Sequence, residues 1–469
     1  MADETPVSPP PARRRIASFL APLHRRHFRS LWLSQVASET GDWAARLALA
    51  TLVYNQTKSA TWSALIFVSG LIPMLGPGQL LATLADSWGR RKVMVGADLV
   101  RAAVFFALAL PIHLPVATLL AMSVVSGLAT APFEAARGSA VIEVIEVSAD
   151  SAGSAGSAGS DLAAAVSLTH ATQDIAVLAG YAAGGSLLAL VGASAALAVN
   201  GCTFLISAVI LSTLPRMCPV RDPGEHRPVG PVIALASRSL SADPLARRLI
   251  LLGTVAVGTG SALDALVVPL TDRAGLAWLA GPLLAAVAAV SLILTLRLGS
   301  RRGTPDYLRI TAWATFAPSA VCCVGLLTGW LPAQMLGILA TGGLYITLVA
   351  AGIVVGPRMP ESLRATCFAI LAGLLTAAQV GMSALGGLLA DVVSPAQAGA
   401  MLLVAPMAAA GYQWLHPLPS PRIWKAPRRR SRSTVEASVD PERDPSPELS
   451  PAPAPGLALS SSQAGSLAS

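Results

Sequence analysis

Residues Leu249–Leu270 read LILLGTVAVGTGSALDALVVPL, an apolar run that contains a single charged side chain, Asp264. A helix of about 20 apolar residues crosses the roughly 30 Å hydrocarbon core of a bilayer, so this run is long enough to span a membrane. Basic residues flank it, with Arg248 immediately before the run and Arg273 shortly after it. The run therefore predicts one transmembrane segment with polar connections at both ends.

Eleven other runs share this length and character. They are Leu31–Tyr54, Trp62–Ala85, Val93–Pro111, Val116–Ala136, Leu162–Leu190, Ala193–Leu214, Ala274–Leu296, Ile310–Trp330, Pro332–Gly356, Ala365–Ala390 and Ala396–Leu415. Backbone polar groups cannot stay unpaired in hydrocarbon, so such segments must be helices or strands of a closed barrel. The runs are too long and too uniformly apolar for barrel strands. We predict an all-α polytopic membrane protein with twelve transmembrane helices in two pseudo-symmetric six-helix halves.

The overall composition agrees with this interpretation. Apolar residues make up 54% of the 469 residues and charged residues 12%, against about 25% charged in soluble domains. These values exclude an ordinary soluble enzyme, a disordered protein and an extracellular disulfide scaffold. The five cysteines lack metal-ligand spacing, and the sequence contains no nucleotide-binding loop, zinc pattern or nucleophile elbow. We expect no enzymatic activity, no metal and no other cofactor.

The chain divides into an N-terminal tail, a first half, a central loop, a second half and a C-terminal tail. Their bounds are 1–30, 31–214, 215–248, 249–415 and 416–469. The C-terminal tail is rich in proline and polar residues and cannot bury a core, so we expect it to be disordered. Residues Ser151–Ser160 repeat Ser-Ala-Gly, which predicts a flexible linker between the fourth and fifth spans.

Basic residues are distributed unevenly between the connections. If the N-terminus is cytoplasmic, the five inner loops hold 16 Lys and Arg residues and the five outer loops hold two, Lys58 and Arg273. Cytoplasmic connections are enriched in Lys and Arg, so both termini and the central loop are predicted to be cytoplasmic. This distribution also explains the formal charge of +8. Nucleic-acid binding is not expected, because the arginines have no aromatic neighbours and no soluble domain to carry them.

The loop between the second and third spans reads LADSWGRRK, Leu84–Lys92. Gly89 permits a tight reversal, and Asp86 lies within five residues of two arginines. Such Asp–Arg pairs at helix ends can hold two helices in one conformation, so the loop predicts a cytoplasmic gate. The residues of the predicted gate are Asp86, Gly89, Arg90, Arg91, Asp98 and Arg101. The alternative is a basic loop that only fixes the topology.

The same loop resembles the signature loop of the major facilitator superfamily, Gly-x-Leu-Ala-Asp-x-x-Gly-Arg-Arg, and departs from it at Ala82. The stretch Phe28–Trp43 resembles the opening of that family's bacterial efflux branch. The resemblance covers the chain from Phe28 to about Leu415. It implies two halves related by a twofold axis around a central cavity, with transport by alternating access.

A glycine-rich stretch in the fifth span, Gly180–Gly185, resembles the antiporter motif Gly-Pro-x-x-Gly-Gly of the same superfamily. Tyr181 stands where the motif has proline, so the kink that proline introduces is not expected. Gly180, Gly184 and Gly185 form a small-residue patch that favours close helix approach. The motif therefore predicts either helix packing or a role in coupling.

Eight ionisable residues fall inside the predicted spans. They are Glu39, Asp42, Arg46, Asp98, Arg101, Glu134, Asp174 and Asp264. A charge at a helix centre costs roughly 2.5–3.5 kcal/mol on insertion scales, so each must be paired, face a cavity or lie near an interface. Five of them are candidates for proton coupling or for a substrate cavity: Glu39, Asp42, Arg46, Asp174 and Asp264.

The spacing of these candidates suggests different roles. Glu39, Asp42 and Arg46 share one helix face, and an Asp42–Arg46 ion pair would leave Glu39 free to titrate. Asp174 lies near the midplane without a cation in its own helix, and Asp264 lies toward the outer end of its span. A low-dielectric cavity favours the neutral form of an isolated carboxyl. Asp174 and Glu39 are therefore the predicted proton carriers. The alternatives are a structural salt bridge for the group of Glu39, Asp42 and Arg46, and a rim position for Asp264.

Glu134 ends the predicted fourth span together with Arg137, so both are expected at the inner interface. Overall, the sequence predicts a monomeric secondary active transporter in the plasma membrane, exporting a small amphipathic compound in antiport with protons. An importer or uniporter remains an alternative, as does a non-transporting membrane protein such as a lipid scramblase or a sensor that uses its tails. The sequence does not identify the substrate.

Overall fold

The computed structural model describes residues 20–76, 81, 88–151, 158–215, 229–299, 307–355, 358–359 and 363–416. Within these ranges every regular element is an α-helix or a short 3-10 helix, and there is no strand. Eight of the described helices are long and apolar enough to cross a membrane. The all-helical membrane architecture that the sequence predicts is therefore confirmed.

The N-terminal half contains the helices α2, α3, α5, α6 and α7. Their bounds are Arg26–Thr57, Ala60–Ser69, Arg90–Leu108, Val116–Ser151 and Ala158–Ser212, with 3-10 helices η1 at Ala21–His24 and η2 at Ile72–Leu75. The segment α7 consists of two helices, because Gly192 interrupts it with a φ of 82°. Glycine adopts this conformation without the steric cost of a Cβ. The two parts of α7 correspond to the fifth and sixth predicted spans.

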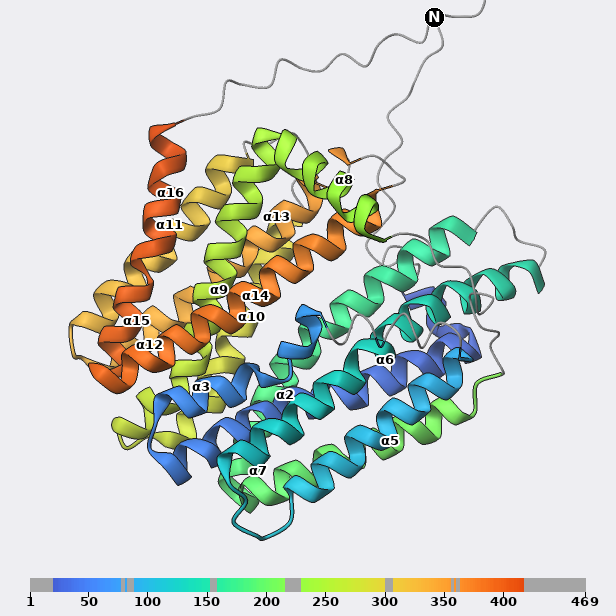
Figure 1. Cartoon of the computed structure of the whole chain (residues 1–469), viewed down its shortest axis with the longest axis horizontal. Helices are drawn as coiled ribbons and strands as arrows, with labels where there is room; N and C mark the ends of the chain where they lie inside the picture. Colours follow the sequence, from blue (N-terminus) through green and yellow to red (C-terminus); the bar gives the residue numbers. More distant parts are fainter. Residues whose placement is uncertain are drawn as a thin grey trace, which may run out of the picture. The chain divides into compact units, whose positions relative to one another are not determined.

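The C-terminal half contains the helices α8 to α16. Their bounds are Val229–Ala242, Pro244–Arg273, Ala280–Gly299, Tyr307–Leu327, Leu331–Ala340, Ile346–Val355, Arg364–Val392, Pro395–Leu402 and Val404–Leu415, with 3-10 helices η3 at Ala277–Leu279 and η4 at Thr341–Tyr345. One predicted span is formed by α12, η4 and α13 in succession, and another by α15 and α16. In Figure 1 the blue-to-green helices α2, α5, α6 and α7 lie together, apart from α11 and α16 of the second half.

Several helices begin at capping residues. The Asp243 carboxylate accepts hydrogen bonds from the backbone N–H groups of Leu245 (2.9 Å) and Ala246 (3.3 Å) at the start of α9. Ser394 accepts from the N–H of Gln397 at 3.2 Å at the start of α15. Proline follows both caps, where its missing N–H is not needed. These side chains satisfy amides that the first helical turn leaves unpaired, and they fix where each span begins.

Some boundaries differ from the prediction. Helix α6 continues to Ser151, past the predicted end of the fourth span at Ala136, and α7 already begins at Ala158. The ends of the predicted Ser-Ala-Gly linker, Ser151 and residues 158–160, are therefore helical, and residues 152–157 lie outside the described ranges. The predicted central loop contains an additional helix, α8, of 14 residues. The extension of α6 buries Ala140, Val141, Val144 and Ile145 on one face and carries glutamates on the other, and such an amphipathic helix is not detected by span hydropathy.

The two halves contact each other where glycines allow their backbones to approach. Helix α7 contacts α10, and α3 contacts α14. A Cβ on Gly281 of α10 would lie 2.5 Å from Cα of Gly185 on α7, and a Cβ on Gly387 of α14 would lie 2.7 Å from Cα of Thr61 on α3. Such distances leave no room for a side chain, so these crossings depend on glycine.

Polar contacts close one end of the interface between the halves. The Asp391 carboxylate at the end of α14 accepts hydrogen bonds from Ser59 Oγ (2.5 Å) and from the N–H groups of Ala60 (2.6 Å) and Thr61 (3.1 Å). A negative charge is favourable at this helix N-terminus, where amides lack intrahelical partners. We call these bonds the Asp391 contact. Beside it, Lys58 Nζ lies 3.3 Å from the carboxylate of Asp272 on α9.

Candidate functional site

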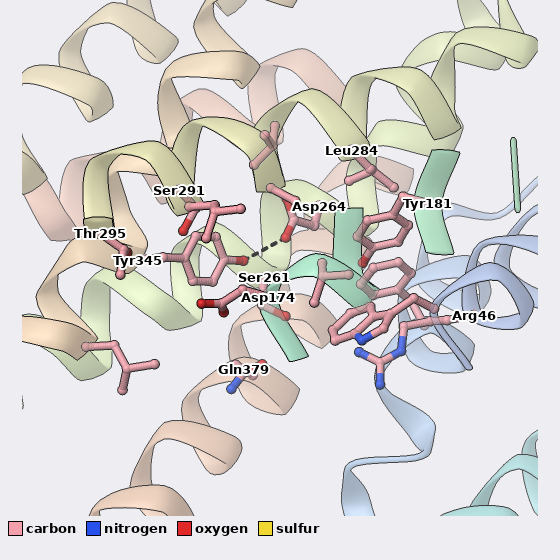
Figure 2. Close-up of a pocket in the computed structure, with 17 residues that line it drawn as sticks. Arg46, Asp174, Tyr181, Ser261, Asp264, Leu284, Ser291, Thr295, Tyr345 and Gln379 are labelled. Atoms are coloured by element: carbon pink, nitrogen blue, oxygen red, sulfur yellow. Dashed lines mark hydrogen bonds between the residues drawn. The ribbon is translucent and has the colours of Figure 1, made fainter. Parts of the chain in front are cut away.

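A cavity of about 200 Å³ lies between the two halves. Its walls come from α2, α3 and α7 of the first half and from α9, α10, α13, α14 and η4 of the second. Figure 2 shows Arg46 and Tyr181 at one end, Thr295 at the other, and Asp264 between them. The cavity therefore brings together a guanidinium, carboxylates and aromatic rings that lie far apart in the sequence.

Asp264 is the most buried acid of this cavity, with an exposed fraction of 9%. Its Oδ2 accepts a hydrogen bond from the Tyr345 hydroxyl at 2.6 Å, drawn as the dashed line in Figure 2. Its Oδ1 is buried and has no hydrogen-bond partner among the residues that the structure describes. The sequence placed Asp264 among the cavity candidates but toward the outer end of its span, whereas the structure places it in the shared cavity.

Arg46 lies at the other end of the same cavity. Its guanidinium carbon is 4.2 Å from the centroid of the Trp43 ring and 5.7 Å from that of Phe67. These three residues also line a second cavity of about 400 Å³ inside the first half, together with Glu39 and Asp42. Arg46 thus lies between the two cavities, and the aromatic faces attract its charge.

Asp174 is the second acid of the cavity between the halves and is exposed. It makes no hydrogen bond or ion pair with any residue in the described part of the chain, and His170 lies one turn earlier on the same helix. This position agrees with the prediction of an acid without a strong cation partner. The polar side chains of Ser261 and Gln379 line the same space.

The predicted Asp42–Arg46 ion pair is not formed. Asp42 instead lies 3.8 Å from the Arg101 guanidinium and accepts a 3.4 Å hydrogen bond from Asn200 Nδ2. Arg101 also pairs with Asp98, which accepts a further hydrogen bond from Ser207 Oγ at 2.6 Å. Residues four apart share a helix face, but α5 and α7 supply closer partners to that face than α2 itself does.

Arg101 and Asp98 are fully buried, with exposed fractions of 2% and 0%. The guanidinium carbon of Arg101 lies 4.3 Å from the ring centroids of both Phe133 and Phe204. The sequence assigned Asp98 and Arg101 to the gate. In the structure they join Asp42 on α2 and Ser207 on α7, which makes them part of the packed interior of the first half.

Glu39 is not free, contrary to the prediction. Its Oε1 lies 2.8 Å from Arg137 Nη1 and accepts a 3.1 Å hydrogen bond from Gln35. Arg137 also pairs with Glu134 at 2.5 Å. Arg137 was expected at the inner interface, but α6 continues well beyond it and the residue is only 5% exposed. One buried arginine therefore holds two carboxylates from two helices.

The described part of the predicted gate begins at Gly89, the residue that precedes the first turn of α5. Arg90 pairs with Glu143 of α6, and Arg91 donates a 2.7 Å hydrogen bond to the carbonyl of Leu214 at the end of α7. Both contacts lie within the first half. Asp86 lies outside the described residues, so the structure does not place the pair that the gate prediction requires.

The small-residue patch of α7 packs closely against α2. A Cβ on Gly180 would lie 2.7 Å from the Thr40 carbonyl oxygen, and a Cβ on Gly184 would lie 2.7 Å from Cα of Ala44. Gly185 faces Gly281 of the other half. Gly180 and Gly184 therefore serve packing within the first half, and Gly185 lies at the contact between the halves.

Three residues of these sites were not found in the sequence. Tyr345 binds Asp264, Glu143 binds Arg90, and Tyr181 lines the cavity beside Trp43, with ring centroids 5.3 Å apart. A signal existed for Tyr345, since the chain has only five tyrosines and this one lies inside an apolar span. In the residues described, no three His, Cys, Asp or Glu side chains are arranged to hold a metal.

The chain is similar to one protein family and to several solved transporter structures. Residues 17–445 match the family described as transmembrane secretion effector, while curated protein sequences give no match. Among solved structures, the nucleoside transporter NupG has a TM-score of 0.64 at 13% identity, over 83% of this chain and 98% of that chain. A bacterial homolog of the human lysosomal transporter Spinster, inward-facing and occupied, has a TM-score of 0.62 at 15% identity, over 87% and 97%. The peptide-family (POT) transporter PepTSo has a TM-score of 0.59 at 13% identity, over 83% and 97%.

At these identities the solved structures show a shared fold and no shared substrate. The family match is stronger evidence, because it spans most of the chain and includes both halves. The chain belongs to the transmembrane secretion effector family of the major facilitator superfamily and is a multi-pass membrane transporter.

Proposed function

We propose that the protein exports a small amphipathic compound across the plasma membrane by alternating access, in exchange for protons. The observation that best supports this function is the cavity between the halves, where Asp264 and Asp174 lie with Arg46 and aromatic side chains. Movement of one half against the other changes the exposure of a site that both halves form. An acid in such a site can bind a proton on one side and release it on the other.

The proposed direction of transport rests on the match to transmembrane secretion effectors, and the charge distribution gives the orientation of the chain in the membrane. With the Arg-rich connections in the cytoplasm, both termini and the central loop are cytoplasmic. Lys58 and the Asp391 contact then lie at the outer end. Because these contacts join the halves there, this conformation favours access to the cavity from the cytoplasm, a state through which exporters and importers both pass. An importer or uniporter would use the same cavity but would not expel compounds against a gradient.

Protons supply enough energy for this task. One charge crossing about 150 mV provides about 3.5 kcal/mol, which sustains a concentration ratio of a few hundredfold. We assign the proton-carrying role to Asp264 and Asp174, since both line the shared cavity and neither pairs with an arginine or lysine in the described part of the chain. Glu39 is assigned a structural role, because Arg137 neutralises it inside the first half.

The loop before α5 is proposed to control the exchange between conformations. Asp86 is close in sequence to Arg90 and Arg91, which the structure ties to α6 and to the end of α7. Loss of the Asp86 charge should slow this exchange and leave binding in the cavity unchanged. Asp86→Asn is therefore expected to reduce the transport rate with little change in substrate affinity, measured by flux and equilibrium binding of the same compound.

The function is tested by accumulation of amphipathic dyes, namely ethidium, acridine orange and carboxyfluorescein, in an efflux-deficient bacterial strain. Cells with the wild-type protein should accumulate less of at least one dye, and an uncoupler that dissipates the proton gradient should abolish the difference. Asp264→Asn and Asp174→Asn should lose uphill export but retain downhill exchange in proteoliposomes. Arg273→Gln, at the exposed end of α9, is the matched control and should export normally. Full pH-dependent uphill export by both aspartate variants would show that the coupling acid lies elsewhere.

A further inference from the structure

Two polar groups in the cavity between the halves lack the partners that their chemistry requires. One is the guanidinium of Arg46 in the first half, and the other is Oδ1 of Asp264 in the second half. Arg46 lies at one end of this space and Asp264 lies nearer its middle, as Figure 2 shows. The ligand that satisfies both of them has a definite chemical character.

Arg46 is half-buried and differs from the two arginines that are buried in the first half. Arg101 holds Asp98 and Asp42, and Arg137 holds Glu39 and Glu134. Arg46 has neither an ion pair nor a hydrogen bond to any residue that the structure describes, and its contacts are the rings of Trp43 and Phe67. An unpaired charge inside a membrane domain is costly. A carboxylate of a bound ligand would supply the bidentate partner that a guanidinium prefers.

Asp264 lacks a hydrogen-bond donor for one of its oxygens among the described residues. Tyr345 satisfies Oδ2, whereas Oδ1 is buried without a donor. A buried acceptor without a partner is destabilising. An ammonium group of a ligand would donate to this oxygen and also balance the charge of the carboxylate.

The surface between these two poles is mainly apolar and aromatic. Trp43, Tyr181, Leu284 and Val287 line this surface, and the ring centroids of Trp43 and Tyr181 lie 5.3 Å apart. A volume of about 200 Å³ suits a small body such as a single aromatic ring. It does not suit the two acyl chains of a phospholipid.

We infer that the cavity binds a small soluble zwitterion with an apolar or aromatic body, its acidic group at Arg46 and its amino group at Asp264 Oδ1. This inference rests on the proposed function and names the substrate class of the same site. One bound ligand would contact both halves, because Arg46 lies on α2 and Asp264 lies on α9. Binding of a zwitterion would then draw the two walls together without introducing net charge into the cavity.

Three probes of nearly equal size separate the two poles. Phenylalanine carries both charges, phenethylamine is the same molecule without the carboxylate, and 3-phenylpropionate is the same molecule without the amine. Binding to the full-length purified protein is measured by isothermal titration calorimetry. Phenylalanine is expected to bind at least about tenfold more tightly than either singly charged probe, since each charge-assisted hydrogen bond contributes about 1.5–3 kcal/mol, and about 1.4 kcal/mol is a factor of ten.

Two variants then test the assignment of each pole. Arg46→Gln should weaken the binding of phenylalanine and 3-phenylpropionate about tenfold and leave the binding of phenethylamine nearly unchanged. Asp264→Asn should weaken the binding of phenylalanine and phenethylamine about tenfold and leave the binding of 3-phenylpropionate nearly unchanged. Arg46→Lys, which keeps the charge, should restore part of the affinity for 3-phenylpropionate. Arg273→Gln is the control for removal of a positive charge outside the cavity. Size-exclusion chromatography confirms that each variant is folded before it is titrated.

Several results would overturn the inference. These are equal affinity for all three probes, equal weakening of all three by both variants, or displacement of phenylalanine by lysophosphatidylethanolamine, which would assign the site to a lipid headgroup. The binding experiment needs no proton gradient and is independent of export. The expected binding pattern without proton-driven export would therefore contradict the proposed function alone. Proton-driven export without the pattern would contradict this inference alone.

Discussion

The two halves of the transporter differ in how their buried charged side chains are compensated. In the first half, Arg101 and Arg137 each hold two carboxylates, so the charges neutralise one another within that half. In the second half, Asp264 is bonded to the neutral hydroxyl of Tyr345 and forms no ion pair with any described residue. The comparison suggests that the first half moves as a unit held by ion pairs. Arg46, which has no carboxylate partner among the described residues, lines the cavity that also contains Asp264.

The physical basis of this difference is the cost of an unpaired charge in a low-dielectric environment. Removing one partner of a buried pair leaves the other charge without compensation, which is far more costly than the pair was stabilising. Loss of a neutral donor such as the Tyr345 hydroxyl costs less free energy than loss of a charged partner. Variants of the two halves should therefore differ in whether they affect folding or function.

The largest effect is expected for Arg137→Gln. The substitution leaves Glu39 and Glu134 as uncompensated carboxylates, at a cost of about 3–5 kcal/mol in the free energy of unfolding. Little monodisperse protein should be recovered in mild detergent, as measured by size-exclusion chromatography. The triple variant with Glu39→Gln and Glu134→Gln removes the unpaired charges and should recover part of the folded protein. If the single variant is as stable as the wild type, the first half is not held by its ion pairs.

An intermediate effect is expected for Tyr345→Phe. It leaves both oxygens of Asp264 without a donor, which should cost about 1–3 kcal/mol. Asp264→Asn keeps an acceptor for the tyrosine and should cost less than about 1 kcal/mol. Thermal unfolding of the two single variants and the double variant tests whether the effects are non-additive, as a direct bond requires. Strictly additive effects would show that the stability of the second half does not depend on this bond.

A smaller effect is expected for Asp391→Asn, which weakens the Asp391 contact without disturbing either half. Loss of the carboxylate charge at the start of α3 should favour separation of the halves at this end by about 1–2 kcal/mol. Spin labels at Gln56 and Val392, in a background without the five native cysteines, should show a larger population at long distance by double electron–electron resonance.

The neighbouring pair provides the control for this prediction. Lys58 is 62% exposed in its side chain and faces Asp272 at 3.3 Å. Exposed pairs contribute about 0–1 kcal/mol, so Lys58→Gln should change the distance distribution little. If Lys58→Gln has the larger effect, the exposed pair rather than the Asp391 contact holds this end closed.

Much of the fold could be predicted from local sequence alone. The apolar run that includes Asp264 became α9, and the break between the fifth and sixth spans falls at Gly192. Span ends were less well predicted. Helix α6 extends to Ser151 and α8 lies in the predicted central loop, because both continue along surfaces that hydropathy does not register.

The candidate site was predicted in part. Asp264, Asp174 and Arg46 were identified as cavity candidates and do line one cavity. The roles based on spacing were less successful, since the expected Asp42–Arg46 pair is absent and Glu39 is bound by Arg137. Spacing of three or four residues reports only which side chains share a face of one helix, whereas the nearest opposite charge lay on a neighbouring helix.

The sequence by itself determined that this chain forms about a dozen membrane-spanning helices. The reason is local, since each span must satisfy its own backbone hydrogen bonds in hydrocarbon and must be long enough to cross it. Only the tertiary structure decided which charges are neutralised within a half and which face the shared cavity. Arg101 and Arg137 obtain carboxylates because α2, α5 and α6 pack together, whereas Arg46 and Asp264 come from helices of different halves and meet at a space that neither half fills.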